Sequence, residues 1–452
     1  MSETAWTAPR VSRAISAVID LPGSKSQTAR ELVLGAISSE PSTLRGALSS
    51  RDTDLMVAGL RQLGAEIAPW PCPPDGEVRI TPVSSRREAS PMPSIECGLA
   101  GTVMRFLPAL AVALGIPARF TADAQANFRP LRPLLDALEA LGAKVVYEDL
   151  ATGVFPFSIF PPKTALPAEV SVDGSASSQF ISALLLAAPL FPADCTIRSK
   201  TLRVPSRPHL EMTQACLSAR GVEVSEFLDE QGKSCWRVEA CRPRSRDTLV
   251  EPDLSNAGAF LAAVGIAGGQ LVVKNWPQHT TQAGDAWREI LPSFGMQVTR
   301  QDTNLQVSGD GTLQAVDLDF SNVGELAPVA AALAAHAHGT SYLRGLHHLR
   351  GHETDRLNAL QTELTRLGID CRITSTDDLV ITGICPPDIP QRSEPVLLRT
   401  YADHRLATFA ALMGMYRSVQ IDDIACTAKT LPEFPQLWQA LFDLPDETGE
   451  PA

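Results

Sequence analysis

An apolar helix pattern opened by small or polar residues recurs along the chain. Each copy is a run rich in Ala and Leu whose start carries Gly, Ser, Asn or Asp. The copies stand roughly 65 to 80 residues apart, which exceeds the period of solenoids and propellers, so each belongs to a small subdomain. The copies begin at Gly23, Gly98, Gly174, Asp253, Asp319 and Tyr401.

An amphipathic helix follows in these subdomains and usually ends at a glycine. At 355–367, for example, Leu357, Leu360, Leu364 and Leu367 recur at helical spacing and form one apolar face. A glycine suits the left-handed residue that ends a helix, and a short strand comes next. Each subdomain therefore reads β-α-β-α-β-β, and six of them fill nearly the whole chain. The amphipathic helices are expected at 53–63, 134–141, 209–220, 287–294 and 355–367, next to Gly64, Gly142, Gly221, Gly295 and Gly368.

The first helix of each subdomain is apolar nearly all round, which predicts that it is buried among sheets. Its N-terminus then presents free backbone N–H groups and the positive end of the helix dipole. Several such N-termini brought together would bind an anion without a net basic charge.

The composition indicates a globular protein, with 452 residues of which 44% are hydrophobic and 20% are charged. The net charge of −12 disfavours nucleic-acid binding but allows a local basic cleft. The most apolar run, 106–118, lies between two arginines and contains prolines, so no membrane span is expected. The N-terminus lacks a signal-peptide pattern, and nine scattered cysteines without a Cys-x-x-Cys pair predict a cytoplasmic protein.

Basic residues stand at helix starts or turns of different subdomains. The stretch 21–30 lacks the glycine spacing of a phosphate-binding loop. It fits either a shorter anion-binding turn or a capped helix with solvated charges. We expect the acidic surplus on the outer surface and in the tails, for example at 446–450. The repeated placement of the cations favours a multiply charged anionic substrate. The cations are Lys25, Arg30, Arg129, Arg356, Arg405 and Lys429.

The densest charged stretch contains His348, His352 and Glu353 and could be interpreted as a metal site. The two histidines precede the expected helix, and no third ligand has suitable spacing, so no metal is predicted. A Ser–His–Asp triad can be assembled from the sequence, but no nucleophile-elbow pattern supports it.

The motifs together resemble those of the 5-enolpyruvylshikimate-3-phosphate synthase family, from about Ile19 to Trp438. The resemblance implies a two-domain inside-out α/β barrel, with three β-α-β-α-β-β units under pseudo-threefold symmetry in each domain. The expected domains are 25–249, with repeats one to three, and 1–24 plus 250–452, with repeats four to six; the active site is expected in the cleft between them. The motifs are Leu21-Pro-Gly-Ser-Lys-Ser, Ala100-Gly-Thr-Val-Met-Arg, Asp173-Gly-Ser-Ala-Ser-Ser-Gln-Phe, Glu353-Thr-Asp-Arg, Asp403-His-Arg and Cys426-Thr-Ala-Lys-Thr.

The resemblance implies an enzyme that transfers the enolpyruvyl group of phosphoenolpyruvate to the 5-hydroxyl of shikimate 3-phosphate, in the shikimate pathway to chorismate and aromatic amino acids. The hydroxyl adds to C2 while C3 is protonated, and the tetrahedral adduct then expels phosphate. Such chemistry needs a base, an acid and cations around the anionic groups. The resemblance implies no cofactor, no nucleic-acid or membrane partner, and a monomer.

The resemblance also carries residue roles onto this chain. Lys25 would assist departure of the bridging oxygen, Glu325 would lie at the substrate hydroxyl, and Glu353 would transfer a proton at the methylene. The residues expected to bind phosphoenolpyruvate are Lys25, Gly101, Arg129, Gln179, Arg356, Arg405 and Lys429. Those expected to bind shikimate 3-phosphate are Lys25, Ser26, Arg30, Ser177, Ser178, Gln179, Ser206, Glu325, His348 and His352.

Six positions depart from the family pattern, among them His209, which stands where Tyr is usual. Glu325 stands where Asp is usual, His348 where Asn is, and His352 where Lys is. Leu99 replaces an asparagine and Phe106 a proline. These departures bear on the polar network and on sensitivity to glyphosate, and they leave the reaction class unchanged.

Two other functions compete with this interpretation. The enolpyruvyl transferase of the same fold that acts on UDP-N-acetylglucosamine normally presents a catalytic cysteine on a loop of the first domain, but 124–133 contains none. A non-catalytic phosphate- or nucleotide-binding scaffold predicts losses among the carboxylates, yet Glu325 and Glu353 are both present.

We predict that His352 partly replaces the charge of the usual lysine. A histidine loses its charge as the pH rises through neutrality, whereas a lysine stays charged. A His352→Lys variant should therefore keep its activity to higher pH than the parent. Rate measurements across pH test this, and identical profiles for the two proteins would contradict it.

Overall fold

Helices and strands alternate along the whole described chain, which comprises residues 5–73, 76–84, 91–149, 153–163, 166–390 and 394–442 of the computed structural model. This confirms the α/β class. The chain divides into two units, Pro22–Glu251 and Met1–Leu21 with Pro252–Ala452. The sequence-based boundaries stood at 24/25 and 249/250. The acidic stretch at 446–450 lies outside the described residues.

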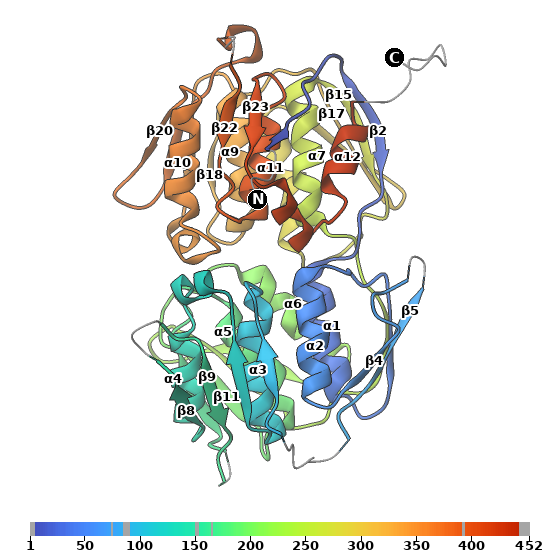
Figure 1. The fold of residues 1–452 in the computed structure, drawn as a ribbon, viewed down its shortest axis with the longest axis vertical. Helices are drawn as coiled ribbons and strands as arrows, with labels where there is room; N and C mark the ends of the chain where they lie inside the picture. The colour runs from blue at the N-terminus through green and yellow to red at the C-terminus, as the bar shows by residue number, and fades with distance from the viewer. Residues whose placement is uncertain are drawn as a thin grey trace. The chain divides into compact units, whose positions relative to one another are not determined.

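Apolar helices form the centre of the unit Pro22–Glu251, drawn from blue to green in Figure 1. These are α1 (Lys25–Ile37), α3 (Gly101–Leu114) and α5 (Gln179–Ala187), and they are buried along nearly their whole length. The prediction that the first helix of each subdomain is buried is confirmed here. The amphipathic helices that follow them bury one face each: α2 (Arg51–Gln62), α4 (Arg132–Ala140) and α6 (Arg207–Ser218).

The sheets of this unit share one topology. A parallel pair is followed by two antiparallel pairs, so the last two strands of each sheet form a hairpin. Within the described ranges, the four-stranded sheets have the orders β14-β3-β5-β4, β6-β7-β9-β8 and β10-β11-β13-β12. The strands are β3 (Ser42–Arg45), β4 (Glu66–Ala68), β5 (Glu77–Thr81), β6 (Ser94–Glu96), β7 (Ala118–Thr121), β8 (Lys144–Tyr147), β9 (Phe157–Phe160), β10 (Glu169–Val172), β11 (Cys195–Ser199), β12 (Val224–Leu228), β13 (Ser234–Val238) and β14 (Asp247–Leu249).

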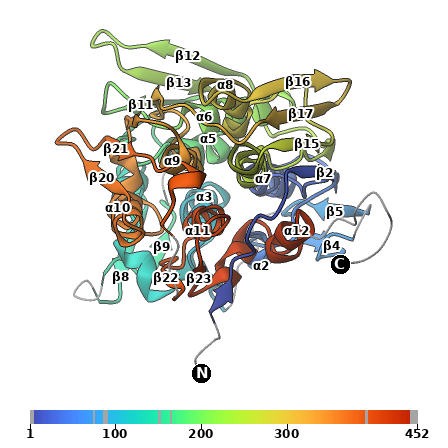
Figure 2. The same ribbon diagram turned by 90° about the horizontal axis from the view of Figure 1, so that it is seen from above.

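The unit with Pro252–Ala452 repeats this plan around its own apolar helices. Figure 2 shows α7 (Leu254–Ala267), α9 (Ala327–His336) and α11 (His404–Met413) inside, with strands of its sheets around them. The second helices are α8 (Trp287–Ser293), α10 (Arg356–Arg366) and α12 (Phe434–Ala440). Its described sheets have the orders β16-β17-β15-β2, β18-β19-β21-β20 and β1-β23-β22. The strands are β1 (Trp6–Thr7), β2 (Ile15–Ile19), β15 (Gly269–Val273), β16 (Gln297–Gln301), β17 (Asn304–Gly309), β18 (Asp317–Asp319), β19 (Thr340–Arg344), β20 (Asp370–Ile373), β21 (Leu379–Thr382), β22 (Val396–Leu398) and β23 (Val419–Ile421).

The opening strand of the first repeat belongs to a different sheet from the rest of that repeat. β2 directly precedes α1 in the sequence, but it pairs in parallel with β15, from Ile15 opposite Gly269 to Ile19 opposite Val273. β14, at the end of the third repeat, instead pairs in parallel with β3. The chain therefore closes each unit with a strand that is distant in sequence, and the alternating pattern of β2 does not specify its partner.

The sixth repeat departs from the predicted β-α-β-α-β-β order. After β23 the described chain continues through a 3-10 helix, Ile424–Lys429, to α12 and ends at Phe442 without another strand. The edge of this sheet is formed by β1, where Trp6 lies opposite Ile421 in an antiparallel pair. The N-terminal segment thus supplies a strand that the described part of the sixth repeat, up to residue 442, does not contain.

Glycines end the amphipathic helices in the left-handed region, as the sequence predicts. Gly64, Gly142, Gly221, Gly295 and Gly368 have φ values of 101, 91, 77, 96 and 81°. The starts of α2, α4 and α6 lie two residues earlier than predicted. Their first turns contain polar residues or proline, as in Arg132-Pro133 and Arg207-Pro208, which carry no apolar periodicity.

The helices were compared with the length and hydropathy of membrane spans. Among the residues that the structure describes, no helix combines the length and the apolar character needed to cross a bilayer.

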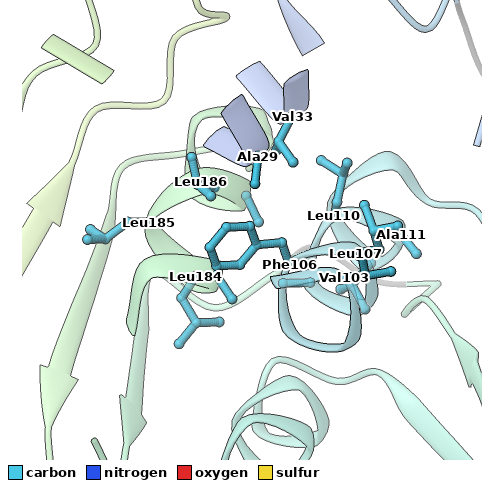
Figure 3. Close-up of a cluster of buried hydrophobic side chains, with 14 of the residues drawn as sticks. Ala29, Val33, Val103, Phe106, Leu107, Leu110, Ala111, Leu184, Leu185 and Leu186 are labelled. Carbon is cyan, nitrogen blue, oxygen red and sulfur yellow. The ribbon is translucent and has the colours of Figure 1, made fainter. Parts of the chain in front are cut away.

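Phe106 fills the centre of the core in the unit Pro22–Glu251. Its side chain extends from α3 toward Ala29 and Val33 of α1 and toward Leu184 of α5 (Figure 3), and it is 1% exposed. The Arg30 guanidinium carbon also lies 5.4 Å from the ring centroid. This ring therefore joins the three central helices of the unit.

We predict that Phe106→Ala lowers the free energy of unfolding by about 3 to 5 kcal/mol, because the change leaves a cavity between close-packed helices. Urea unfolding followed by circular dichroism measures this loss. The matched control is Phe128→Ala in the same unit, since Phe128 is 86% exposed and its loss should cost less than about 0.5 kcal/mol. Equal losses in the two variants would contradict the packing role of Phe106.

Candidate active site

Lys25 stands at the start of α1, paired with a carboxylate from α2. Ser24 caps the helix by accepting a hydrogen bond from the Gln27 backbone N–H at 3.4 Å. The Lys25 Nζ lies 3.3 Å from Asp52 Oδ2, with the lysine side chain 18% exposed and the aspartate 4%. The sequence analysis did not identify Asp52, although an acidic residue in the first turn of a helix is a recognisable sequence signal.

Gly101, at the start of α3, lies where three long polar side chains converge. A Cβ atom on it would stand 2.9 Å from an Arg129 nitrogen, 3.2 Å from Gln179 Oε1 and 3.4 Å from an Arg105 nitrogen. Arg105 donates to Gln179 Oε1 at 2.6 Å, and Arg129 donates to the carbonyl of Leu99 at 2.6 Å. The structure thus brings together the predicted Gly101, Arg129 and Gln179. It adds Arg105, which lies one helical turn from Gly101.

Arg30 is buried inside the unit and hydrogen-bonds to α6 and to its own helix. It is 1% exposed, and its guanidinium donates to the Thr213 hydroxyl at 2.8 Å and to the carbonyls of Ser26 and His209 at 2.8 and 3.0 Å. Burial lowers the pKa of Arg30 to about 10. These donors therefore serve protein acceptors.

The predicted serines lie at or near helix starts of the same unit. Ser26 is in the first turn of α1, and Ser177 and Ser178 precede Gln179, the first residue of α5. The Ser177 hydroxyl accepts from the Gln179 backbone N–H at 3.3 Å. Ser206 precedes α6 with a left-handed φ of 55°, and its hydroxyl makes no cap bond to that helix.

In the unit with Pro252–Ala452, a chain of buried ion pairs connects four predicted or motif residues. The Lys429 Nζ lies 2.5 Å from Glu353 Oε1, and Arg356 donates to Glu353 Oε2 at 3.0 Å. Arg356 also donates to both oxygens of Asp403, at 2.7 and 3.1 Å. Burial acts to lower the pKa of Arg356, but Asp403 and Glu353 raise it above its usual value. The guanidinium is therefore held charged and fixed in direction.

Arg405 lies next to this chain, at the start of α11. Its backbone N–H donates to Asp403 Oδ1 at 2.9 Å, and its guanidinium donates to the Ser255 carbonyl at the start of α7 at 2.9 Å. Burial lowers the pKa of Arg405, although the acidic residues around it, Asp253 first among them, oppose this. The starts of α7 and α11 are thus adjacent, as the anion-site hypothesis requires.

Asp403 orients Arg356 and caps α11, and it sits behind a strained turn. Tyr401 and Ala402 both have left-handed backbone angles, with φ of 55 and 56°, which non-glycine residues seldom adopt. The Tyr401 hydroxyl donates to Glu363 Oε1 of α10 at 2.7 Å. Asp403 belongs to a motif in the sequence, but its partner, 47 residues away, could not be deduced from that motif.

Glu325, His348 and His352 lie in the same unit. Glu325 is in the 3-10 turn Gly324–Leu326 that leads into α9. A Cβ atom on Gly324 would stand 2.1 Å from His348 Nε2, so the ring packs directly on the glycine. The rings of His348 and His352 are 6.0 Å apart, and His352 Nδ1 lies 3.9 Å from Glu353 Oε2. Burial lowers the pKa of His348 to about 4, with Glu325 opposing the shift, so His348 is neutral at pH 7.

Carboxylates partner three of the predicted cations. Asp52, Glu353 and Asp403 are buried beside Lys25, Lys429 and Arg356. The physical reason is that a buried cation is costly unless an opposite charge or hydrogen bonds compensate it. Within the described ranges, no three His, Cys, Asp or Glu side chains are arranged to hold a metal ion.

Comparisons with known proteins agree on one family. A family model described as EPSP synthase (3-phosphoshikimate 1-carboxyvinyltransferase) matches residues 9–438. A 3-phosphoshikimate 1-carboxyvinyltransferase of Kocuria rhizophila is 48% identical over 96% of each chain, and one of Mycobacterium ulcerans is 43% identical over 97% of this chain and 98% of that one.

Solved structures share the fold. An EPSP synthase from Acinetobacter baumannii has a TM-score of 0.74 at 24% identity, covering 96% of this chain and 98% of that chain. The enolpyruvyl transferase NikO from Streptomyces tendae has a TM-score of 0.73 at 17% identity, covering 96% and 97%. With the family match over nearly its whole length, the chain belongs to the EPSP synthase (3-phosphoshikimate 1-carboxyvinyltransferase) family.

Proposed function

We propose that this protein transfers the enolpyruvyl group of phosphoenolpyruvate to the 5-hydroxyl of shikimate 3-phosphate. The products are 5-enolpyruvylshikimate 3-phosphate and phosphate, in the shikimate pathway to chorismate and aromatic amino acids. The observation that carries the proposal is the chain of ion pairs from Lys429 through Glu353 and Arg356 to Asp403. These ion pairs place the Glu353 carboxylate between two cations. The protein belongs to the family that the comparisons define.

The reaction is an addition followed by an elimination. The hydroxyl oxygen bonds to C2 of phosphoenolpyruvate, its proton passes to a base, and C3 receives a proton from an acid. The tetrahedral adduct then loses a proton from C3, and the bond between C2 and the phosphate oxygen breaks. Charge develops at the departing oxygen, so a cation placed there lowers the barrier.

Glu353 is suited to deliver the proton to C3 because substrate binding changes its surroundings. In the free protein both of its oxygens are held by cations, Lys429 and Arg356, which favour the ionised form. The phosphate and carboxylate of phosphoenolpyruvate compete for these cations. As they draw Lys429 away, the proton affinity of Glu353 rises, so the carboxylate takes up a proton and can then deliver it to C3.

Both units supply residues to both substrates in this proposal. Phosphoenolpyruvate is assigned to Gly101, Arg129 and Gln179 of one unit and to Arg356, Arg405 and Lys429 of the other, with Lys25 between the two substrates. Shikimate 3-phosphate is assigned to the serines, Arg30 and Gln179 of the first unit and to Glu325, His348 and His352 of the second.

The proposed setting is the cytoplasm, with the protein as a monomer and no cofactor. All nine cysteines, each within the described ranges, are free thiols, which accords with a reducing compartment.

Phosphate release tests the reaction and its acceptor. Purified protein with phosphoenolpyruvate should release phosphate when shikimate 3-phosphate is added, and none when UDP-N-acetylglucosamine replaces it or when no acceptor is present. A coupled assay for inorganic phosphate gives the rates. Binding of phosphoenolpyruvate without phosphate release in the presence of shikimate 3-phosphate would instead indicate a non-catalytic scaffold.

Lys25→Met and Glu353→Gln should each lower kcat by at least about 100-fold, because each removes a group that acts on the transition state. Circular dichroism should show that both variants remain folded. The matched controls are Lys144→Met on β8 and Glu289→Gln on α8, which make the same changes at exposed positions. Parental activity in both site variants would refute the assignment.

A further inference from the structure

Arg350 contacts two acidic residues, one directly after the segment that carries Glu353 and one in the turn between β20 and β21. It lies in the 3-10 helix His347–Gly351, and its side chain is 33% exposed. One guanidinium nitrogen donates to Asp355 Oδ2 at 2.7 Å. The other two donors contact a single oxygen of Asp377, at 3.0 and 2.7 Å. The planar fork of arginine can reach two acceptors in this way, which a lysine cannot do.

The contact with Asp355 closes a short loop around the proposed proton donor. Asp355 caps α10, since its side chain accepts from the Asn358 backbone N–H at 3.1 Å. Residues 352–354, which include His352 and Glu353, lie between the 3-10 helix and this cap and form bends without regular structure. Arg356, the first residue of α10, follows directly. The ion pair therefore joins the two ends of the segment that presents Glu353.

Asp377 gives this loop a rigid support. It lies in the turn between β20 and β21, with a left-handed φ of 59°, and its backbone N–H donates to the Thr374 carbonyl at 3.1 Å. The neighbouring Asp378 accepts from the Gly345 backbone N–H at 3.0 Å, close to where the chain enters the 3-10 helix. Hydrogen bonding from Arg350, and then from His347, lowers the pKa of Asp377, so this carboxylate is ionised at neutral pH.

We propose that Arg350 is a positioning residue that fixes the loop presenting Glu353 by tying it to the β20–β21 turn and to the cap of α10. Arg350 acts through Glu353 and does not itself touch the reacting atoms. The inference rests on the proposed function, in which Glu353 transfers a proton at the methylene. Proton transfer depends on placement within a fraction of an ångström, so a loop without regular structure needs such a support.

The contacts also predict which kinetic constant changes when Arg350 is removed. Arg356 has its own anchor in the two bonds to Asp403, so the cation that is proposed to bind phosphoenolpyruvate stays in place. Glu353 loses the ion pair that joins the two ends of its loop. Loss of Arg350 should therefore lower kcat much more than it raises KM for phosphoenolpyruvate.

The test compares variants of the full-length protein in the phosphate-release assay. Arg350→Gln should lower kcat by about 10- to 100-fold and change KM for phosphoenolpyruvate by less than about threefold. Arg350→Lys, which keeps the charge but reaches one carboxylate at a time, should recover part of the loss. Asp377→Asn should lower kcat in the same direction, and asparagine tolerates the left-handed backbone of that position.

Arg288→Gln is the matched control. Arg288 is also an arginine of the same unit, on α8, and it pairs with Asp285, with its side chain 41% exposed. This pair lies outside both the Glu353 loop and the β20–β21 turn, so its loss should leave kcat within about twofold of the parent, as expected for an exposed ion pair.

Amide hydrogen exchange without substrates separates this inference from the proposed function. Arg350→Gln should speed exchange in peptides covering 346–356, and Arg288→Gln should not. If the parent protein releases no phosphate, the proposed function is overturned. The hydrogen-exchange comparison still decides whether Arg350 holds the loop, because it needs no substrate. Unchanged exchange at 346–356, or a kcat within twofold of the parent in Arg350→Gln, would overturn the positioning role.

Discussion

A helix that is apolar on every side must be enclosed on every side, and this constraint determines where polar chemistry can be placed in each unit. The flanks of α3 and α7 are buried over nearly their whole length, so polar groups are accommodated at the helix starts. Lys25, Gly101 and Gln179 open the central helices of one unit, and Arg405 opens one in the other. The burial of the helix flanks is therefore also the reason why the candidate site residues gather at the helix starts.

The candidate site balances its charge locally. Lys25 is paired with Asp52, Lys429 with Glu353, and Arg356 with Asp403. In the absence of substrate these pairs avoid the large cost of isolated buried cations. They also allow an acidic chain of net charge −12 to present cations to anionic ligands. An incoming phosphate or carboxylate exchanges one anionic partner for another, so binding does not have to supply the whole cost of bringing charges together.

Much of the fold follows from local pattern, since the repeated helices and the glycines at their ends depend on residues close in sequence. Gly64 and Gly368, for example, end their helices as expected. The exchange of β2 and β14 between sheets does not follow, because two strands with similar alternation compete for equivalent edges and only the assembled sheets decide between them. For the same reason the cations of the site could be predicted from motifs, whereas the contacts of Asp52 with Lys25 and of Arg105 with Gln179 could not. The partners in these contacts, 27 and 74 residues apart, are brought together by the fold.

The pairing of the N-terminal strands has a consequence for how the protein is made. β2 needs β15 as its parallel partner, and β1 needs β23, so neither can enter its sheet until the distant strand has been synthesised. The unit Pro22–Glu251 contains the described strands of its own sheets and is synthesised before Pro252–Ala452. During that time β1 and β2 have no partner strands. Co-translational folding of this chain therefore proceeds from its middle outward, and the N-terminus is among the last parts to become structured.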